Sequence, residues 1–243
     1  MTQTIVTFLL DRTGSMPSCK EATIEAFNAY LDTLKKNPEG IEFSFLQFDS
    51  QSLDKICIAE SPDKVAPLTD ATYEPRASTP LIDAAYKTIK AVEAALTKRD
   101  DTPRIVICIQ TDGYENASSQ YTMPELSLLI KEKTALDWQF VFMGAGIDAY
   151  TQGAQLGIAA THTMSYDQSR KHTMAAFQAS AENTVRYAQG AAPAAAFSHQ
   201  QRADAADAFA HIARPPDSGS ANQQPPAKPA KPTMRAIVDD VSL

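Results

Sequence analysis

The sequence has 243 residues, of which 44% are hydrophobic. A chain of this length buries a core of its own, and we expect one domain of about 150 to 200 residues with additional material. Its 29 acidic residues outnumber its 22 Lys and Arg residues, which gives a net charge of −7 at pH 7, and no run of Lys and Arg supplies a local basic patch. Because this charge repels a phosphate backbone, we expect no nucleic-acid partner.

The cysteines and the N-terminus predict a cytoplasmic protein. Cys19, Cys57 and Cys108 lie far apart, are odd in number and form no CxxC pair, so we expect reduced thiols rather than a disulfide framework. The N-terminus has no basic region, and its apolar stretch at 5–10 is too short for a signal peptide or a membrane span. We therefore expect no membrane association.

The first elements along the chain read as strand, helix, strand, strand. Residues 5–10 are nearly continuous in apolar side chains, which predicts a strand covered on both faces of a parallel sheet. Ser18 and Glu21 have the spacing of a capping box at the start of an amphipathic helix. Residues 41–45 alternate as a second strand and 53–60 predict a third, and the turn between them is short enough to permit only an antiparallel pair.

The remaining predicted elements alternate between helix and strand up to residue 189. Helices are predicted at 80–98, 122–135, 149–156 and 169–189, and strands at 104–110, 139–143 and 161–166. This order predicts an α/β fold with a central, mostly parallel six-stranded sheet, one antiparallel edge strand and helices on both faces. Sheets of this kind bind ligands beyond the carboxyl ends of their strands.

The composition changes beyond residue 190. An alanine-rich extension at 191–214 predicts a helix over 194–213, and the segment at 215–233 predicts an extended, proline-rich disordered linker. The chain then ends in a short apolar and acidic peptide at 234–243. This peptide is either an inert terminus or a segment that docks on another protein or on a second copy.

Five oxygen-bearing side chains predict a metal site at the carboxyl edge of the sheet. Asp11, Thr13 and Ser15 alternate in one turn directly after the first predicted strand, so they can converge on one point. Thr79, at the start of the second long helix, and Asp112, after a strand, belong to the same edge. Oxygen ligands suit a hard cation such as Mg2+, with Mn2+ and Ca2+ as alternatives, and waters complete its coordination shell.

These five residues resemble the metal-ion-dependent adhesion site (MIDAS) of von Willebrand factor A (VWA) domains. The pattern of that site is D-x-S/T-x-S, then a distant Thr and a distant Asp. The resemblance covers roughly residues 3–190 and assigns a VWA domain to 1–190, with a three-layer Rossmann-like fold. The form D-R-T-G-S-M, with Arg12 and Met16, is similar to bacterial and phage members.

The resemblance implies a binding and scaffolding role without catalysis. Two carboxylates at most neutralise one divalent ion, and the other three donors are neutral hydroxyls, so an open coordination position attracts a further carboxylate. VWA domains use that position to accept an Asp or Glu of a partner protein. Bacterial members often accompany ATPases, which implies a place in a multiprotein assembly. Independently of the resemblance, the apolar and acidic C-terminal peptide suggests self-association as an alternative.

Other interpretations of the same residues stay open. The D-x-T-x-S turn by itself is often only a turn with a helix cap. Gly144, Gly146 and Ala149 match a permissive dinucleotide fingerprint with Asp167 further on, which would suit a nucleotide- or phosphate-handling Mg2+-dependent enzyme. Aspartyl-phosphate phosphatases need a second acid where this chain has Thr13. We therefore expect no catalytic residues.

Overall fold

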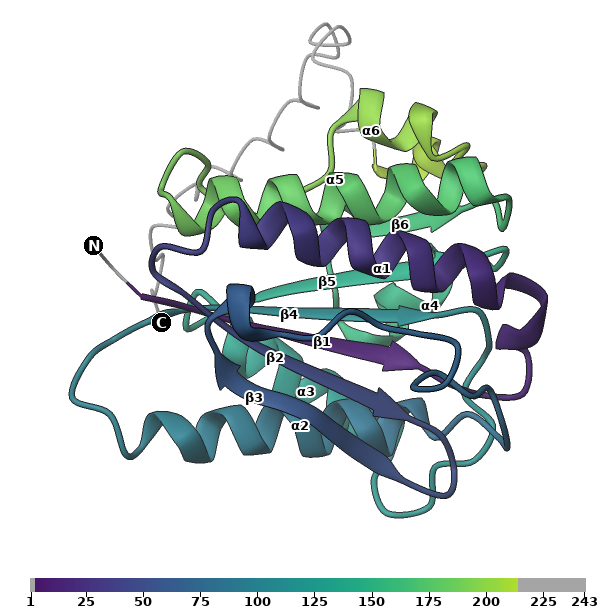
Figure 1. Ribbon diagram of the computed structural model, residues 1–243. Coiled ribbons are helices and arrows are strands. Elements are labelled where there is room, and N and C mark those ends of the chain that lie inside the picture. The colour runs from purple at the N-terminus through teal and green to yellow at the C-terminus, as the bar shows by residue number, and fades with distance from the viewer. Residues whose placement is uncertain (1–2, 214–243) are drawn as a thin grey trace, which may run out of the picture. The chain divides into compact units, whose positions relative to one another are not determined.

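Six strands form one sheet in the order β3-β2-β1-β4-β5-β6 (Figure 1). The strands are β1 (Thr4–Asp11), β2 (Ile41–Phe48), β3 (Leu53–Glu60), β4 (Arg104–Thr111), β5 (Gln139–Ala145) and β6 (Thr163–Tyr166). All neighbouring pairs are parallel except β2 and β3, which are antiparallel. This computed structural model describes residues 3–213, so the predicted linker and C-terminal peptide lie outside the described residues.

Helices cover both faces of the sheet. The helices are α1 (Lys20–Lys35), α2 (Leu81–Leu96), α3 (Met123–Thr134), α4 (Ala149–Leu156), α5 (Arg170–Ala188) and α6 (His199–Asp204). One hydrophobic core joins the sheet to α1 and α5, and a second joins its other face to α2, α3 and α4 (Figure 1). The predicted α/β architecture is therefore confirmed. No helix among the residues described has both the length and the apolar character needed to cross a membrane.

The position of β1 inside the sheet, with helices on both faces, explains why its sequence is almost continuously apolar. Phe8 and Leu10 face the core formed with α1 and α5, whereas Ile5 and Leu9 face the opposite core. All eight residues of β1 are buried. Alternate side chains of a strand point to opposite faces, so a strand buried on both faces needs apolar residues at successive positions.

Two helix starts test the predicted capping boxes. The box at Thr122 is confirmed, since its hydroxyl accepts the Glu125 N–H and the Glu125 carboxylate accepts the Thr122 N–H. The box at Ser18 and Glu21 is wrong. A short 3₁₀ turn precedes α1, and within it the Ser18 hydroxyl donates to the Ser15 carbonyl at 3.1 Å. The Ser18 hydroxyl is therefore bonded within the 3₁₀ turn, and no side chain caps the start of α1.

The predicted helix over 194–213 is wrong in its extent. Only α6 and a 3₁₀ turn at the end of this stretch are helical. Ser198 and Gln201 form a capping box that begins α6, and Ala206 adopts a left-handed φ of 52° just beyond its end. The segment packs on the sheet domain and belongs to the same compact unit, so tertiary contacts override its helical propensity here.

A buried arginine connects this segment to the edge strand β6 through hydrogen bonds. The Arg202 side chain is 2% exposed and donates to the backbone carbonyls of Ala160, Thr161 and Thr163. It also forms an ion pair with Asp207 at 3.4 Å. Since Thr163 belongs to edge strand β6, Arg202 ties the extension to that edge.

Candidate metal site

The ends of two neighbouring strands place acidic residues side by side. Strands β1 and β4 pair in parallel, with Leu10 opposite Gln110, so Asp11 at the end of β1 lies beside the end of β4. Asp112 follows immediately after β4. The chain leaves β1 towards β2 on one side and returns to β4 on the other, and α/β sheets hold ligands in the crevice at such a reversal.

The protein fixes both carboxylate oxygens of Asp11. The Thr13 N–H donates to Oδ1 at 2.7 Å and the Thr111 hydroxyl donates to Oδ2 at 2.5 Å. The Tyr73 hydroxyl donates to the Asp11 backbone carbonyl at 2.6 Å. Asp11 is fully buried, so its carboxylate is held in one orientation.

A continuous chain of hydroxyl contacts joins the other four predicted residues. The Ser15 hydroxyl donates to Asp112 Oδ1 at 2.5 Å, and Ser15 Oγ lies 3.3 Å from Thr13 Oγ1. The Thr79 hydroxyl donates to Thr13 Oγ1 at 3.0 Å. All five predicted residues therefore form one cluster drawn from three loops. Thr13, Thr79 and Asp112 are buried, and Ser15 is its solvent-exposed member.

The two carboxylates of this cluster have no cationic partner in the described part of the chain. None of the ion pairs among residues 3–213 includes Asp11 or Asp112. Burial raises the pKa of Asp11 to about 7 despite its hydrogen bonds from Thr111 and Thr13. Burial also raises the pKa of Asp112. Removing a carboxylate from water without a countercharge disfavours its ionised form, and a bound cation would reverse that effect.

The donor set suits a hard divalent cation. Every side-chain donor is an oxygen, as Mg2+, Mn2+ and Ca2+ prefer. Among residues 3–213 no three His, Cys, Asp or Glu side chains gather to hold a metal, so a cation here would need the three hydroxyls and water beside the two carboxylates. A Cβ at Gly113 would lie 3.4 Å from both Ser15 Oγ and Thr79 Oγ1, so glycine leaves space beside these donors.

Two residues that the sequence patterns did not identify hold the cluster in place. Thr111 binds Asp11 as described above, and its hydroxyl also accepts the Gly113 N–H at 3.0 Å. Asn116 binds Thr79 with both its side chain and its backbone. Thr111 could have been suspected from its position between a strand and Asp112. Nothing in the sequence links Asn116 to a residue 37 positions earlier.

Arg12, inside the D-R-T-G-S turn, points away from the cluster. Its guanidinium donates to Asp49 Oδ2 at 2.7 and 3.0 Å and to Asp54 Oδ2 at 2.8 Å. Arg76 donates to the same Asp49 oxygen at 3.0 Å. Although burial opposes it, hydrogen bonds from Gln51 and from the two arginines lower the pKa of Asp49. Arg12 therefore anchors the site loop to the β2–β3 hairpin instead of neutralising Asp11.

Neighbouring side chains pack closely against the two glycines at the end of β5, Gly144 and Gly146. A Cβ at Gly144 would lie 2.7 Å from Ala149 Cβ and 2.8 Å from Ile147 Cγ1. Gly146 has a φ of 66°, and a Cβ there would lie 3.0 to 3.2 Å from the Gln168 side chain. Close packing against Gly144 and a tight reversal at Gly146 therefore account for both glycines without a nucleotide.

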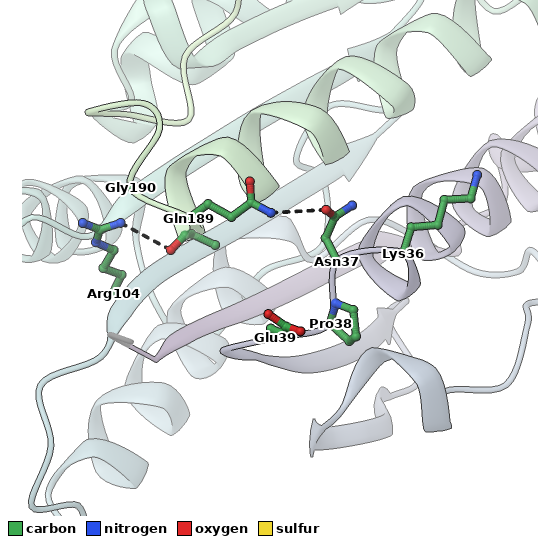
Figure 2. A pocket seen from close by; sticks show the side chains of 8 residues that line it. Lys36, Asn37, Pro38, Glu39, Arg104, Gln189 and Gly190 are labelled. Carbon is green, nitrogen blue, oxygen red and sulfur yellow. Dashed lines mark hydrogen bonds between the residues drawn. The ribbon is translucent and has the colours of Figure 1, made fainter.

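A cavity of about 470 Å3 lies at the opposite, amino edge of the sheet, where α1 and α5 end. Figure 2 shows that Arg104 and Gln189 reach towards neighbouring backbone and side-chain groups there. Arg104 donates to the carbonyls of Tyr187 and Ala188, and Gln189 donates to Asn37 Oδ1 at 3.2 Å. These side chains form hydrogen bonds at the C-terminal ends of α1 and α5. None of the five predicted residues lines the cavity.

No protein family and no curated protein matches this sequence. Solved structures do resemble its fold. The manganese-loaded TRAP protein of Plasmodium vivax has a TM-score of 0.53 at 15% identity, over 69% of each chain. The SpRpn10 VWA domain has a TM-score of 0.50 at 12% identity, over 72% of this chain and 93% of that one. The chain therefore has a Rossmann-like VWA fold.

Two further matches are with longer proteins. The pilus adhesin SpaC from Lactobacillus rhamnosus GG has a TM-score of 0.60 at 11% identity, over 77% of this chain and 30% of SpaC. Proximal thread matrix protein 1 from the mussel byssus has a TM-score of 0.51 at 14% identity, over 77% of this chain and 46% of that protein. The chain spans less than half the length of these two proteins.

Proposed function

We propose that this chain is a divalent-cation-dependent protein-binding module without catalytic activity. Its metal site consists of Asp11, Thr13, Ser15, Thr79 and Asp112, and Mg2+ is the cation, with Mn2+ and Ca2+ as alternatives. When bound, the cation supplies a Lewis-acidic position that accepts a carboxylate oxygen of a partner protein. The observation that carries the proposal is the single cluster of five oxygen donors from three loops, which contains two buried carboxylates and no cationic side chain.

The roles of the five residues follow from their positions. Asp11 and Asp112 provide the negative charge, and the three hydroxyls set the geometry. Both oxygens of Asp11 already accept hydrogen bonds from the protein, which favours contact between Asp11 and the cation through water. Ser15 is the exposed member of the cluster, so a partner carboxylate would approach beside it.

The partner is a protein that presents an Asp or Glu side chain. The likeness in fold to a manganese-loaded protein and to a pilus adhesin supports this class of function. We further propose a cytoplasmic setting, of the bacterial or phage type, within a multiprotein assembly that includes an ATPase, or self-association through residues 234–243. The bacterial or phage type and the assembly rest on the sequence resemblance, the cytoplasmic setting rests on the cysteines and the N-terminus, and the self-association rests on the apolar and acidic character of residues 234–243.

The burial of Asp11 argues against the alternative of a phosphate-handling enzyme. A nucleophilic carboxylate must reach its substrate, whereas Asp11 is fully buried and both its oxygens are bound. Thr13 stands where aspartyl-phosphate chemistry needs an acid. Close packing and a tight reversal account for Gly144 and Gly146, so these glycines do not by themselves support a nucleotide site.

Calorimetric titration of the full chain with Mg2+ tests the metal site. We expect one equivalent to bind, and Asp11→Asn and Asp112→Asn to weaken binding by at least about 100-fold while the far-UV circular dichroism stays unchanged. Asp148→Asn is the matched control, because Asp148 lies at the same edge of the sheet and caps α4 outside the cluster. Wild-type chain that binds no divalent cation, or acidic-site variants that bind as wild type does, would refute the proposal.

The partner can then be sought by affinity capture with and without a chelator. We expect a protein that is retained with Mg2+, released by EDTA and absent from the Asp112→Asn capture. A protein that is retained in EDTA and is also captured by Asp112→Asn would show that the partner binds another surface.

A further inference from the structure

One exposed aromatic side chain stands in the loop that carries Asp112. The large apolar side chains exposed among residues 3–213 are Ile56, Ile58, Tyr114, Leu128, Leu136 and Ile212. Of these, only Tyr114 belongs to a loop that carries a residue of the metal cluster, and it is 56% exposed. Tyr114 directly follows Gly113, which lies beside Ser15 Oγ and Thr79 Oγ1, so Tyr114 adjoins the candidate site.

The backbone on both sides of Tyr114 is anchored. Before it, the Gly113 N–H donates to the Thr111 hydroxyl at 3.0 Å. After it, the Glu115 carboxylate accepts the Ile82 N–H at 2.8 Å. Asn116 forms hydrogen bonds with the backbone of Thr79. The ring is thus exposed on a backbone that is already fixed. An exposed aromatic ring on an ordered loop loses little conformational entropy when it is covered by a partner.

We propose that Tyr114 is the specificity-determining contact of the metal site, and that it covers an apolar side chain next to the captured Asp or Glu. This inference rests on the proposed function and specifies its partner: an extended acidic segment in which an aliphatic residue neighbours the acid. Aromatic residues that become covered by a partner often contribute much of the affinity of an interface.

The charge of the site favours an apolar neighbour over a basic one. A Lys or Arg next to the captured acid would lie close to a divalent cation and be repelled by it. An aliphatic side chain meets no such repulsion, and it removes part of the Tyr114 ring from water.

Two short peptides test the inference on the Mg2+-loaded full chain. One is acetyl-Gly-Leu-Asp-Leu-Gly-amide and the other is acetyl-Gly-Ser-Asp-Ser-Gly-amide, and chemical-shift titration measures weak binding of each. We expect the leucine peptide to bind wild type about fivefold more tightly than the serine peptide. Tyr114→Ser should reduce that preference to about one, because the surface that covers leucine is lost.

Leu136→Ser is the matched control variant. Leu136 is 62% exposed but lies in the turn before β5, at the amino edge of the sheet, so this variant should keep the fivefold preference. Equal binding of the two peptides by wild type, or a preference that survives in Tyr114→Ser, would overturn the inference. So would a Tyr114→Ser chain whose Mg2+ affinity falls together with peptide binding, since the ring would then act on the metal cluster.

The Mg2+ titration separates this inference from the proposed function. Absence of Mg2+ binding in wild type rejects both. Mg2+ binding without any preference between the peptides, or without binding of either one, rejects the role of Tyr114 and leaves the metal site standing.

Discussion

Asn116 holds Thr79 at two points. The Asn116 side-chain oxygen accepts the Thr79 N–H at 2.8 Å, and the Asn116 backbone N–H donates to the Thr79 carbonyl at 3.1 Å. Thr79 in turn donates its hydroxyl to Thr13. The loop after β4 therefore positions a hydroxyl of the candidate metal site through a residue that is not itself a donor to the cation.

Replacing Asn116 by Ala should weaken Mg2+ binding by about tenfold, because residues that orient metal ligands typically contribute 10- to 100-fold to affinity. The loss of one hydrogen bond should also lower the unfolding free energy of the metal-free chain by about 1 kcal/mol. Calorimetric titration and urea denaturation measure the two effects.

Asn28→Ala is the control for the Asn116 variant. The Asn28 side chain, on α1, forms two hydrogen bonds with the backbone of Leu68, at 2.8 and 2.9 Å. Leu68 lies in the segment before α2, eleven positions before Thr79, and is not a member of the cluster. This variant should lose stability yet keep its Mg2+ affinity. If both variants bind Mg2+ as wild type does, Asn116 has only a structural role.

Stability of the metal-free chain should fall as pH rises through the range in which Asp11 ionises. The folded state raises the pKa of Asp11 from 3.8 to about 7, so folding favours the protonated form. The stabilising contribution is complete below about pH 4 and is lost as pH rises through about 7. Between pH 5 and pH 8 Asp11 should account for a loss of about 2 to 3 kcal/mol.

Urea denaturation in EDTA at these two pH values measures that loss, and Asp11→Asn isolates it because the variant cannot ionise at this position. The stability difference between variant and wild type should change by that amount, and saturating Mg2+ should restore wild-type stability at pH 8. A difference that is the same at both pH values would show that Asp11 does not titrate in this range.

Arg202 should be among the most sensitive positions for stability. Arg202→Ala leaves Asp207 buried without its cation and removes the donors to three backbone carbonyls near β6. Breaking a buried ion pair in this way typically costs about 3 to 5 kcal/mol. Thermal and urea denaturation should both show this loss.

Arg99→Ala is the comparison for the Arg202 variant. Arg99 is 24% exposed and pairs with Glu42 and Asp101 near the surface, and such pairs contribute about 0 to 1 kcal/mol. Equal losses in the two variants would mean that the extension is only loosely attached to the sheet.

Much of the architecture was predictable because it is encoded locally. The alternation of apolar runs and helical periodicities predicted all six strands and their mixed parallel arrangement. The capping box at Thr122 was predictable for the same reason, since both partners lie within four residues. The box at Ser18 failed because a 3₁₀ turn intervenes before α1, and propensity does not distinguish these two kinds of helical turn.

The candidate site was likewise predictable only in part. The five proposed ligands follow a spacing that is visible in the chain, and they lie together in the fold, while their binding of a metal stays a prediction. The contact between Asn116 and Thr79 spans 37 residues, and no short pattern connects the two. Only the tertiary packing therefore shows that the loop after β4 holds Thr79.

By itself, the sequence determined the order of the elements, the two-sided burial of β1 and the gathering of oxygen-bearing residues at one edge of the sheet, because periodicity and strand order act over short stretches. Only the tertiary structure decided how residues 191–213 are held. Alanine-rich composition favours a long helix, but the buried Arg202 side chain must reach carbonyls about forty residues earlier. A charged group in a core is stable only where such partners are present, and that requirement, not local propensity, sets the path of this segment.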